Sequence, residues 1–159
     1  MNSTDASARL PFRLASAGLA AGAAAHVLAF AVGPAWMVWL GAPPSIVASR
    51  AAGSWPAPVG TLGITVVLLA LAIACWMPAR TIVHRLGLAL LALLFVLRGL
   101  LVLPYWAGLR DWRTPIGHFV VRGESFAAGS LVVLAIGLLV AGGLLCARPH
   151  RFISSRANP

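Results

Sequence analysis

The chain has 159 residues, of which 60% are hydrophobic and only 9% are charged, and its net charge is +9. A soluble globular domain is about one-quarter charged, and a small water-soluble fold exposes too much of its surface to hide so many apolar side chains. The composition therefore excludes an ordinary soluble domain and predicts one integral membrane domain. The arginines are scattered at the ends of apolar runs, a placement that favours anionic lipid head groups as partners and argues against nucleic acid.

Residues 1–13 are small and polar and are expected to form a disordered lead-in. Arg9, Arg13 and the apolar run behind them also fit a cleaved signal peptide. No soluble domain follows that run, so a retained membrane helix is the favoured interpretation.

Four apolar runs follow, each long enough to cross about 30 Å of hydrocarbon as an α-helix. The predicted helices cover about residues 14–40, 57–77, 86–106 and 125–147. Pro34 should kink or end the first helix near an interface. The prediction is an all-α, four-helix transmembrane bundle that forms a single domain over residues 14–147, followed by a basic tail over residues 148–159.

The connections differ in character. Residues 41–55 form a medium-length loop, in which Ser45–Ala52 is expected to form a short interfacial helix begun by Pro44. The loop over residues 107–124 is longer and carries both signs of charge. The two halves of the chain show no sequence repeat, so an inverted-repeat transporter has no support.

The distribution of arginines predicts the orientation. With four spans, both termini and the middle loop share one side, and arginine-rich loops lie in the cytoplasm. That side holds Arg9, Arg13, Arg80, Arg85, Arg148, Arg151 and Arg156, whereas the other holds Arg50, Arg110, Arg113 and Arg122. The expected arrangement is a multi-pass protein of the bacterial inner (plasma) membrane with cytoplasmic N- and C-termini.

The aromatic residues gather at the outer ends of the predicted helices and in the outer loops. This group contains Trp36, Trp39, Trp55, Tyr105, Trp106 and Trp112, and Trp76 alone marks the inner side. One interpretation is an uneven interfacial aromatic belt. The other is that some of these rings, Trp55 and Tyr105 among them, line an outward-facing mouth.

Arg98 is the charged residue inside a predicted span. It follows Leu86 by twelve positions, about 18 Å along a helix, which places it in the outer half of the bilayer. A charge there costs about 2.5–3.5 kcal/mol on insertion scales, so such residues usually face the bundle interior or a polar cavity. Arg98 either snorkels or staples helices, or it binds a ligand. Glu124, at the outer start of the fourth helix, is its expected ion-pair partner.

His26 lies at the same depth as Arg98, twelve residues after Leu14. Gly18, Gly22 and His26 are spaced four apart on one helical face, and small residues at this spacing let another backbone approach closely. Gly129, Gly137 and Ala141 offer a matching face on the fourth helix, so these two helices are expected to pack together. A lone buried histidine is more often a satisfied hydrogen-bonding group than a ligand or a proton carrier.

Taken together, these depths predict one polar layer. The hypothetical ligand-binding residues are His26, Arg98, Glu124, Tyr105 and Trp55, a set suited to the head group of a lipid, quinone or small amphiphile. Haem would need paired histidines on facing helices, and no zinc spacing or nucleophile motif occurs. No catalytic residue, metal site or cofactor is therefore predicted.

Four stretches of the chain carry a family resemblance. They are GAPPSIVASRAAGSW (Gly41–Trp55), APVGTLGI (Ala57–Ile64), RLGLALLALLFVLRGL (Arg85–Leu100) and ESFAAGSLVVLAIGLL (Glu124–Leu139). Together they resemble a group of small bacterial four-helix membrane proteins classed as domains of unknown function. The resemblance implies a topology over about His26 to Gly143 and no known activity.

Three functional hypotheses follow. The first is a non-enzymatic bundle that binds a lipid-like or small amphiphilic molecule, or a membrane protein partner, at its outer side. The second is a membrane enzyme or redox accessory for a membrane-soluble substrate, with His26 as acid/base and Arg98 as anion clamp. The third is a small transporter that acts as a dimer, since the many small residues permit a homo-oligomer without requiring it.

Overall fold

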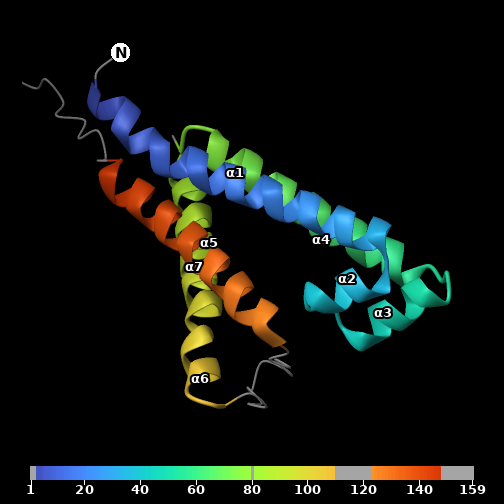
Figure 1. The fold of residues 1–159 in the computed structure, drawn as a ribbon. Helices are drawn as coiled ribbons and strands as arrows, with labels where there is room; N and C mark the ends of the chain where they lie inside the picture. The colour runs from blue at the N-terminus through green and yellow to red at the C-terminus, as the bar shows by residue number, and fades with distance from the viewer. Residues whose placement is uncertain (1–2, 80, 110–122, 148–159) are drawn as a thin grey trace, which may run out of the picture.

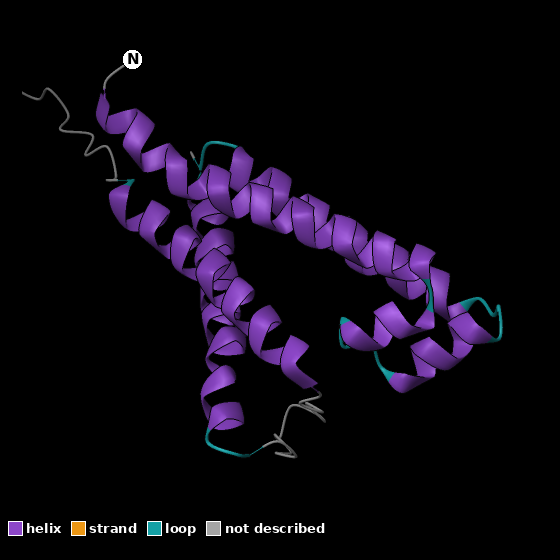
Figure 2. Cartoon of the chain, viewed as in Figure 1, coloured by secondary structure: helices purple, strands orange, loops and turns teal. Residues whose placement is uncertain are grey.

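In the computed structural model, residues 3–79, 81–109 and 123–147 are described, with side chains from Arg9 onward and, in the last segment, from Ser125 onward. Over these residues the chain folds into helices joined by short turns, and it has no strand (Figure 2). The helices are α1 (Ser3–Val32), α2 (Pro34–Trp39), α3 (Pro44–Ala51), α4 (Pro56–Trp76), α5 (Ile82–Leu100), α6 (Val102–Trp106) and α7 (Gly123–Cys146).

Four segments among the described residues are long and apolar enough to cross a membrane. They are Arg9–Val32, Pro56–Trp76, Ile82–Trp106 and Ser125–Cys146. The prediction of an all-α chain with four transmembrane helices is therefore confirmed, and the chain has the architecture of a multi-pass membrane protein. The predicted tail over residues 148–159 lies outside the described residues.

The first helix differs from its predicted bounds at both ends. It ends at Val32, not near Leu40, because Gly33 has a φ of 132°, outside the helical region, and Pro34 then begins α2 at its first position. At the other end, residues 3–13 are helical and do not form the expected disordered lead-in. Adding residues to an existing helix gains one hydrogen bond for each residue fixed, so a short polar segment can continue a helix that it would not nucleate.

The third span begins earlier than predicted and contains a break. Thr81 caps α5 by accepting a hydrogen bond from the backbone N–H of His84, so the helix starts at Ile82 rather than Leu86. Leu101 separates α5 from the short α6, which ends at Trp106 as expected. The short helix predicted over Ser45–Ala52 is present as α3, which begins at Pro44 and ends at Ala51.

The four long helices form two antiparallel pairs, α1 with α4 and α5 with α7, joined through contacts between α1 and α7 (Figure 1). Helices α4 and α5 touch at few residues. Figure 1 shows the two pairs close together where α4 leads into α5 and diverging toward their other ends. Helices α2 and α3 lie at the end of the α1–α4 pair that is far from this connection, and that end is called the α2–α3 end below. Helix α6 lies at the far end of the α5–α7 pair.

The α5–α7 pair is closely packed because glycines remove side chains at the crossing. A Cβ on Gly99 would lie 2.7 Å from Leu134 Cα, and a Cβ on Gly137 would lie 2.9 Å from Val96 N. Both glycines are buried. The two backbones therefore meet directly, as small residues allow in membrane bundles.

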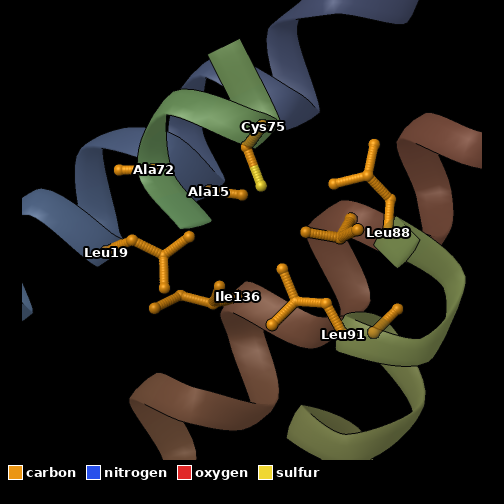
Figure 3. Packing of buried hydrophobic residues seen from close by; sticks show 9 residues of the cluster. Ala15, Leu19, Ala72, Cys75, Leu88, Leu91 and Ile136 are labelled. Atoms are coloured by element: carbon orange, nitrogen blue, oxygen red, sulfur yellow. The ribbon is translucent and has the colours of Figure 1, made fainter. Parts of the chain in front are cut away.

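The central core lies where all four long helices meet (Figure 3). Leu19, Cys75, Leu88 and Ile136 come from α1, α4, α5 and α7 in turn, and all are buried there. The buried Ser16 hydroxyl donates a hydrogen bond of 2.8 Å to the Ala72 carbonyl and so links α1 to α4.

The predicted packing of the first helix against the fourth long helix is confirmed, with a different set of contacts. A Cβ on Gly18 would meet Ile136 of α7 at 3.1 Å, and one on Gly143 would meet Phe12 of α1 at 2.8 Å. Gly22, in contrast, faces Leu68 of α4. The expected small face of α1 is thus divided between two neighbours.

Candidate functional site

A pocket of about 250 Å³ lies at the α2–α3 end, between the α1–α4 pair and the α2–α3 segment that folds back against it. It is lined by His26 and Ala29 of α1, by Met37, Leu40, Gly41, Ala42, Pro43 and Ile46 of the α2–α3 segment, and by Gly60, Thr61 and Ile64 of α4. The lining is mostly apolar, and one side of the pocket is open. Ligand pockets commonly enclose about 300–1,000 Å³, so this one suits a ring or head group whose chain extends into lipid.

Local backbone features direct the α2–α3 segment over the pocket. Gly33 has a φ of 132° and Gly41 a φ of 87°, conformations that glycine adopts without the strain of a Cβ. Directly after Gly41, the Ala42 N–H donates to the Met37 carbonyl and closes the end of α2. Pro43 and Pro44 then start α3 in a new direction.

Arg50 attaches α3 to the end of α1. Its Nε donates a hydrogen bond of 3.0 Å to the Phe30 carbonyl, and its guanidinium lies 4.7 Å from the centroid of the Phe30 ring. Carbonyls in the last turn of a helix lack partners within the helix, and a cation there is favoured by the helix dipole. Arg50 therefore holds the cover of the pocket in place by capping α1.

His26 supplies the pocket with an oriented polar group. It is half-buried, and its Nδ1 lies 2.8 Å from the Gly22 carbonyl one turn earlier. A carbonyl only accepts, so Nδ1 is the donor and carries a proton. Nε2 is then the ring atom left for other contacts, and it makes no hydrogen bond among the described residues.

Arg98 lies on the other helix pair and is half-buried against α7. Its Nη1 donates a hydrogen bond of 2.9 Å to Ser130 Oγ, and its guanidinium lies 4.7 Å from the centroid of the Phe126 ring. Phe126 also packs on Tyr105, with ring centroids 5.5 Å apart. Ser130 is fully buried. These contacts let Arg98 join α5 to α7 within a mostly apolar environment.

The structure divides the predicted ligand-binding residues between two places. Arg98 and Tyr105 lie together, since both contact the Phe126 ring, whereas His26 lies apart from them in the pocket. His26 hydrogen-bonds within α1 and lines the pocket, whereas Arg98 hydrogen-bonds to Ser130 of α7, and the pocket has no lining residue from α5, α6 or α7. Tyr105 is buried beside Phe126, and Trp55 is 72% exposed at the start of α4. The side chain of Glu124 lies outside the described residues, as does all of Trp112. The expected Arg98–Glu124 ion pair therefore stays a prediction.

The sequence analysis did not predict two groups of contacts. Ser130 and Phe126 are the partners of Arg98. A comparison of depths would have indicated Ser130, since Arg98 lies about 12 Å before Trp106 and Ser130 about 8 Å after Ser125, near the same end of the two spans. The α2–α3 cover of the pocket had a weaker signal. Gly33-Pro34 and Pro43-Pro44 mark turns, but they do not reveal the direction in which the chain returns.

Comparisons with family models, with curated proteins and with solved structures found no match to the chain. The resemblance to small bacterial four-helix membrane proteins therefore stays a prediction.

Proposed function

We propose that this chain is a membrane protein that binds a lipid-like or small amphiphilic molecule in the pocket between α1, α4 and the α2–α3 segment. The observation behind the proposal is the pocket itself, which is mostly apolar, open on one side and supplied with an imidazole. Small-molecule sites are usually apolar clefts with a small number of polar groups that orient the ligand, which is the character of this pocket.

The depth of the pocket supports an amphiphilic ligand. His26 lies six residues before the end of α1, about 9 Å inside the span. Trp36, Trp39 and Trp55 are exposed around the same end of the molecule, and tryptophan favours the membrane–water interface. A ligand there would have its polar group near the interface and its apolar part in hydrocarbon.

The proposal places the protein in a bacterial inner membrane, with both termini in the cytoplasm and the pocket on the outer side. The arginine bias of the loops supports this orientation. Arg13 and Trp76 are consistent with an inner interface, since the guanidinium lies 5.3 Å from the ring centroid at the end of the molecule opposite the pocket.

A pair of glycine substitutions on α4 tests the proposal. Gly60 lines the pocket, and a Cβ there would make ordinary contact with Ile46 Cδ1 at 3.8 Å, so Gly60→Leu should fold while its side chain occupies the pocket. Gly63 is one turn away, outside the pocket lining, with nothing within 4 Å of its Cβ. Gly63→Leu is thus a matched control with the same gain in helix propensity.

The measurement is native mass spectrometry of the protein extracted from its membrane in mild detergent. We expect the wild type and Gly63→Leu to retain one small amphiphile each, and Gly60→Leu to retain about tenfold less, which corresponds to about 1.4 kcal/mol of binding free energy. Equal retention by Gly60→Leu, or no bound molecule in the wild type, would refute the proposed function.

A further inference from the structure

The polar groups of the pocket are few, and they constrain the ligand. Among the lining residues, only His26 and Thr61 have side chains with nitrogen or oxygen atoms. No charged side chain belongs to the lining. The polar contact available to a bound molecule is therefore set mainly by the state of the imidazole.

The hydrogen bond to Gly22 determines that state. Because Nδ1 donates to the Gly22 carbonyl at 2.8 Å, the proton of a neutral imidazole is on Nδ1 and Nε2 has a lone pair. Nε2 thus acts as an acceptor, and the complementary group on a ligand is a donor such as a hydroxyl.

We infer that the pocket selects an apolar molecule with a hydroxyl group, such as a long-chain phenol, quinol or alcohol, whose O–H donates to Nε2 of His26. This inference rests on the proposed function and adds the chemical class of the ligand. The volume of about 250 Å³ equals roughly eight water molecules at 30 Å³ each. That space accommodates a single hydroxylated ring or a short length of chain.

Two probes that differ by one methyl group test this class directly. 4-Octylphenol has the required O–H, whereas 4-octylanisole has the same body with the hydroxyl capped as a methyl ether. Native mass spectrometry titrations in one detergent would measure the binding of each probe, with Gly60→Leu as the background for non-specific association. The wild type should bind the phenol about tenfold more tightly, because the ether leaves Nε2 without a partner.

Two variants identify the acceptor. His26→Phe keeps a ring of similar size without the nitrogen and should reduce the preference for the phenol to within about twofold. Thr61→Val removes the other polar side chain and should leave the preference unchanged. The wild-type ratio tests the inference even if His26→Phe does not accumulate.

The possible outcomes separate the inference from the proposed function. Equal binding of both probes by the wild type, above the Gly60→Leu background, would overturn the hydroxyl class and leave an apolar pocket. A tenfold preference that survives in His26→Phe, or disappears in Thr61→Val, would overturn the assignment to His26. Failure of both probes to bind above background would overturn the inference and the proposed function together.

Discussion

The crossing of α5 and α7 leads to a quantitative prediction for Gly99→Ala. The new Cβ would lie 2.5 Å from Leu134 Cβ, 2.7 Å from its Cα and 2.8 Å from its N. Carbon atoms pack best at about 3.5–4.0 Å, so the two helices must separate by about 1 Å. Because two of the three obstructing atoms belong to the backbone, a side-chain rotation cannot relieve the clash.

The cost can be estimated from opposing terms. Overpacking a well-filled site costs about 1–3 kcal/mol, and a backbone clash belongs at the upper end. Replacing glycine by alanine in a helix returns about 1 kcal/mol. The net destabilisation is therefore about 2 kcal/mol, or roughly thirtyfold in the unfolding equilibrium.

Gly87→Ala is the matched control on the same helix, since Gly87 is exposed and has nothing within 4 Å of its Cβ. It should be neutral or slightly stabilising. Reversible unfolding in mixed dodecylmaltoside and dodecyl sulfate micelles, followed by circular dichroism, measures both variants. If Gly99→Ala proved as stable as Gly87→Ala, the inference that the backbones of α5 and α7 are in direct contact at Gly99 would be refuted.

Three further predictions concern individual side chains. Ser130→Ala should lower the free energy of unfolding by about 1 kcal/mol in the same micelle assay, because Arg98 loses its hydroxyl acceptor. An unchanged midpoint of the unfolding transition would show that this hydrogen bond adds no net stability. Arg50→Ala should speed amide hydrogen exchange in α2 and α3 by about tenfold, because the cap on α1 is lost, and identical exchange would contradict its role. The proposed orientation puts residue 54 outside and the exposed Cys146 in the cytoplasm. An impermeant thiol reagent added to intact spheroplasts should therefore label Ser54→Cys and leave Cys146 unlabelled until lysis. The reverse pattern would invert the proposed orientation.

The membrane spans were predictable because the thickness of the bilayer sets the length of each apolar run. Their ends depended on local chemistry that is only partly visible in sequence. Pro44 was expected to begin a short helix and does so, and α4 begins at Pro56, one residue before its predicted start. The sequence predicted a kink or an end at Pro34 in a helix that reached residue 40, whereas the helix breaks at Gly33. The positive φ of this glycine is known only from the folded backbone.

The candidate site was harder to predict because depth along a helix does not fix rotation around the bundle. His26 and Arg98 were placed at similar depth, yet one faces a pocket on the α1–α4 pair and the other faces Ser130 on α7. Separating them requires knowing that α4 and α5 meet at few residues. That property depends on tertiary packing, which hydrophobic periodicity does not encode when every face of a helix is apolar.

The central claim is that the pocket binds one kind of amphiphile. Photo-crosslinking in the native membrane tests it most directly. A photoreactive phenylalanine derivative at Thr61, which lines the pocket, is compared with the same derivative at the exposed Leu62. After irradiation, intact-mass spectrometry should show one discrete adduct from position 61 and a mixture of membrane phospholipids from position 62. The same phospholipid mixture at both positions would contradict a selective pocket.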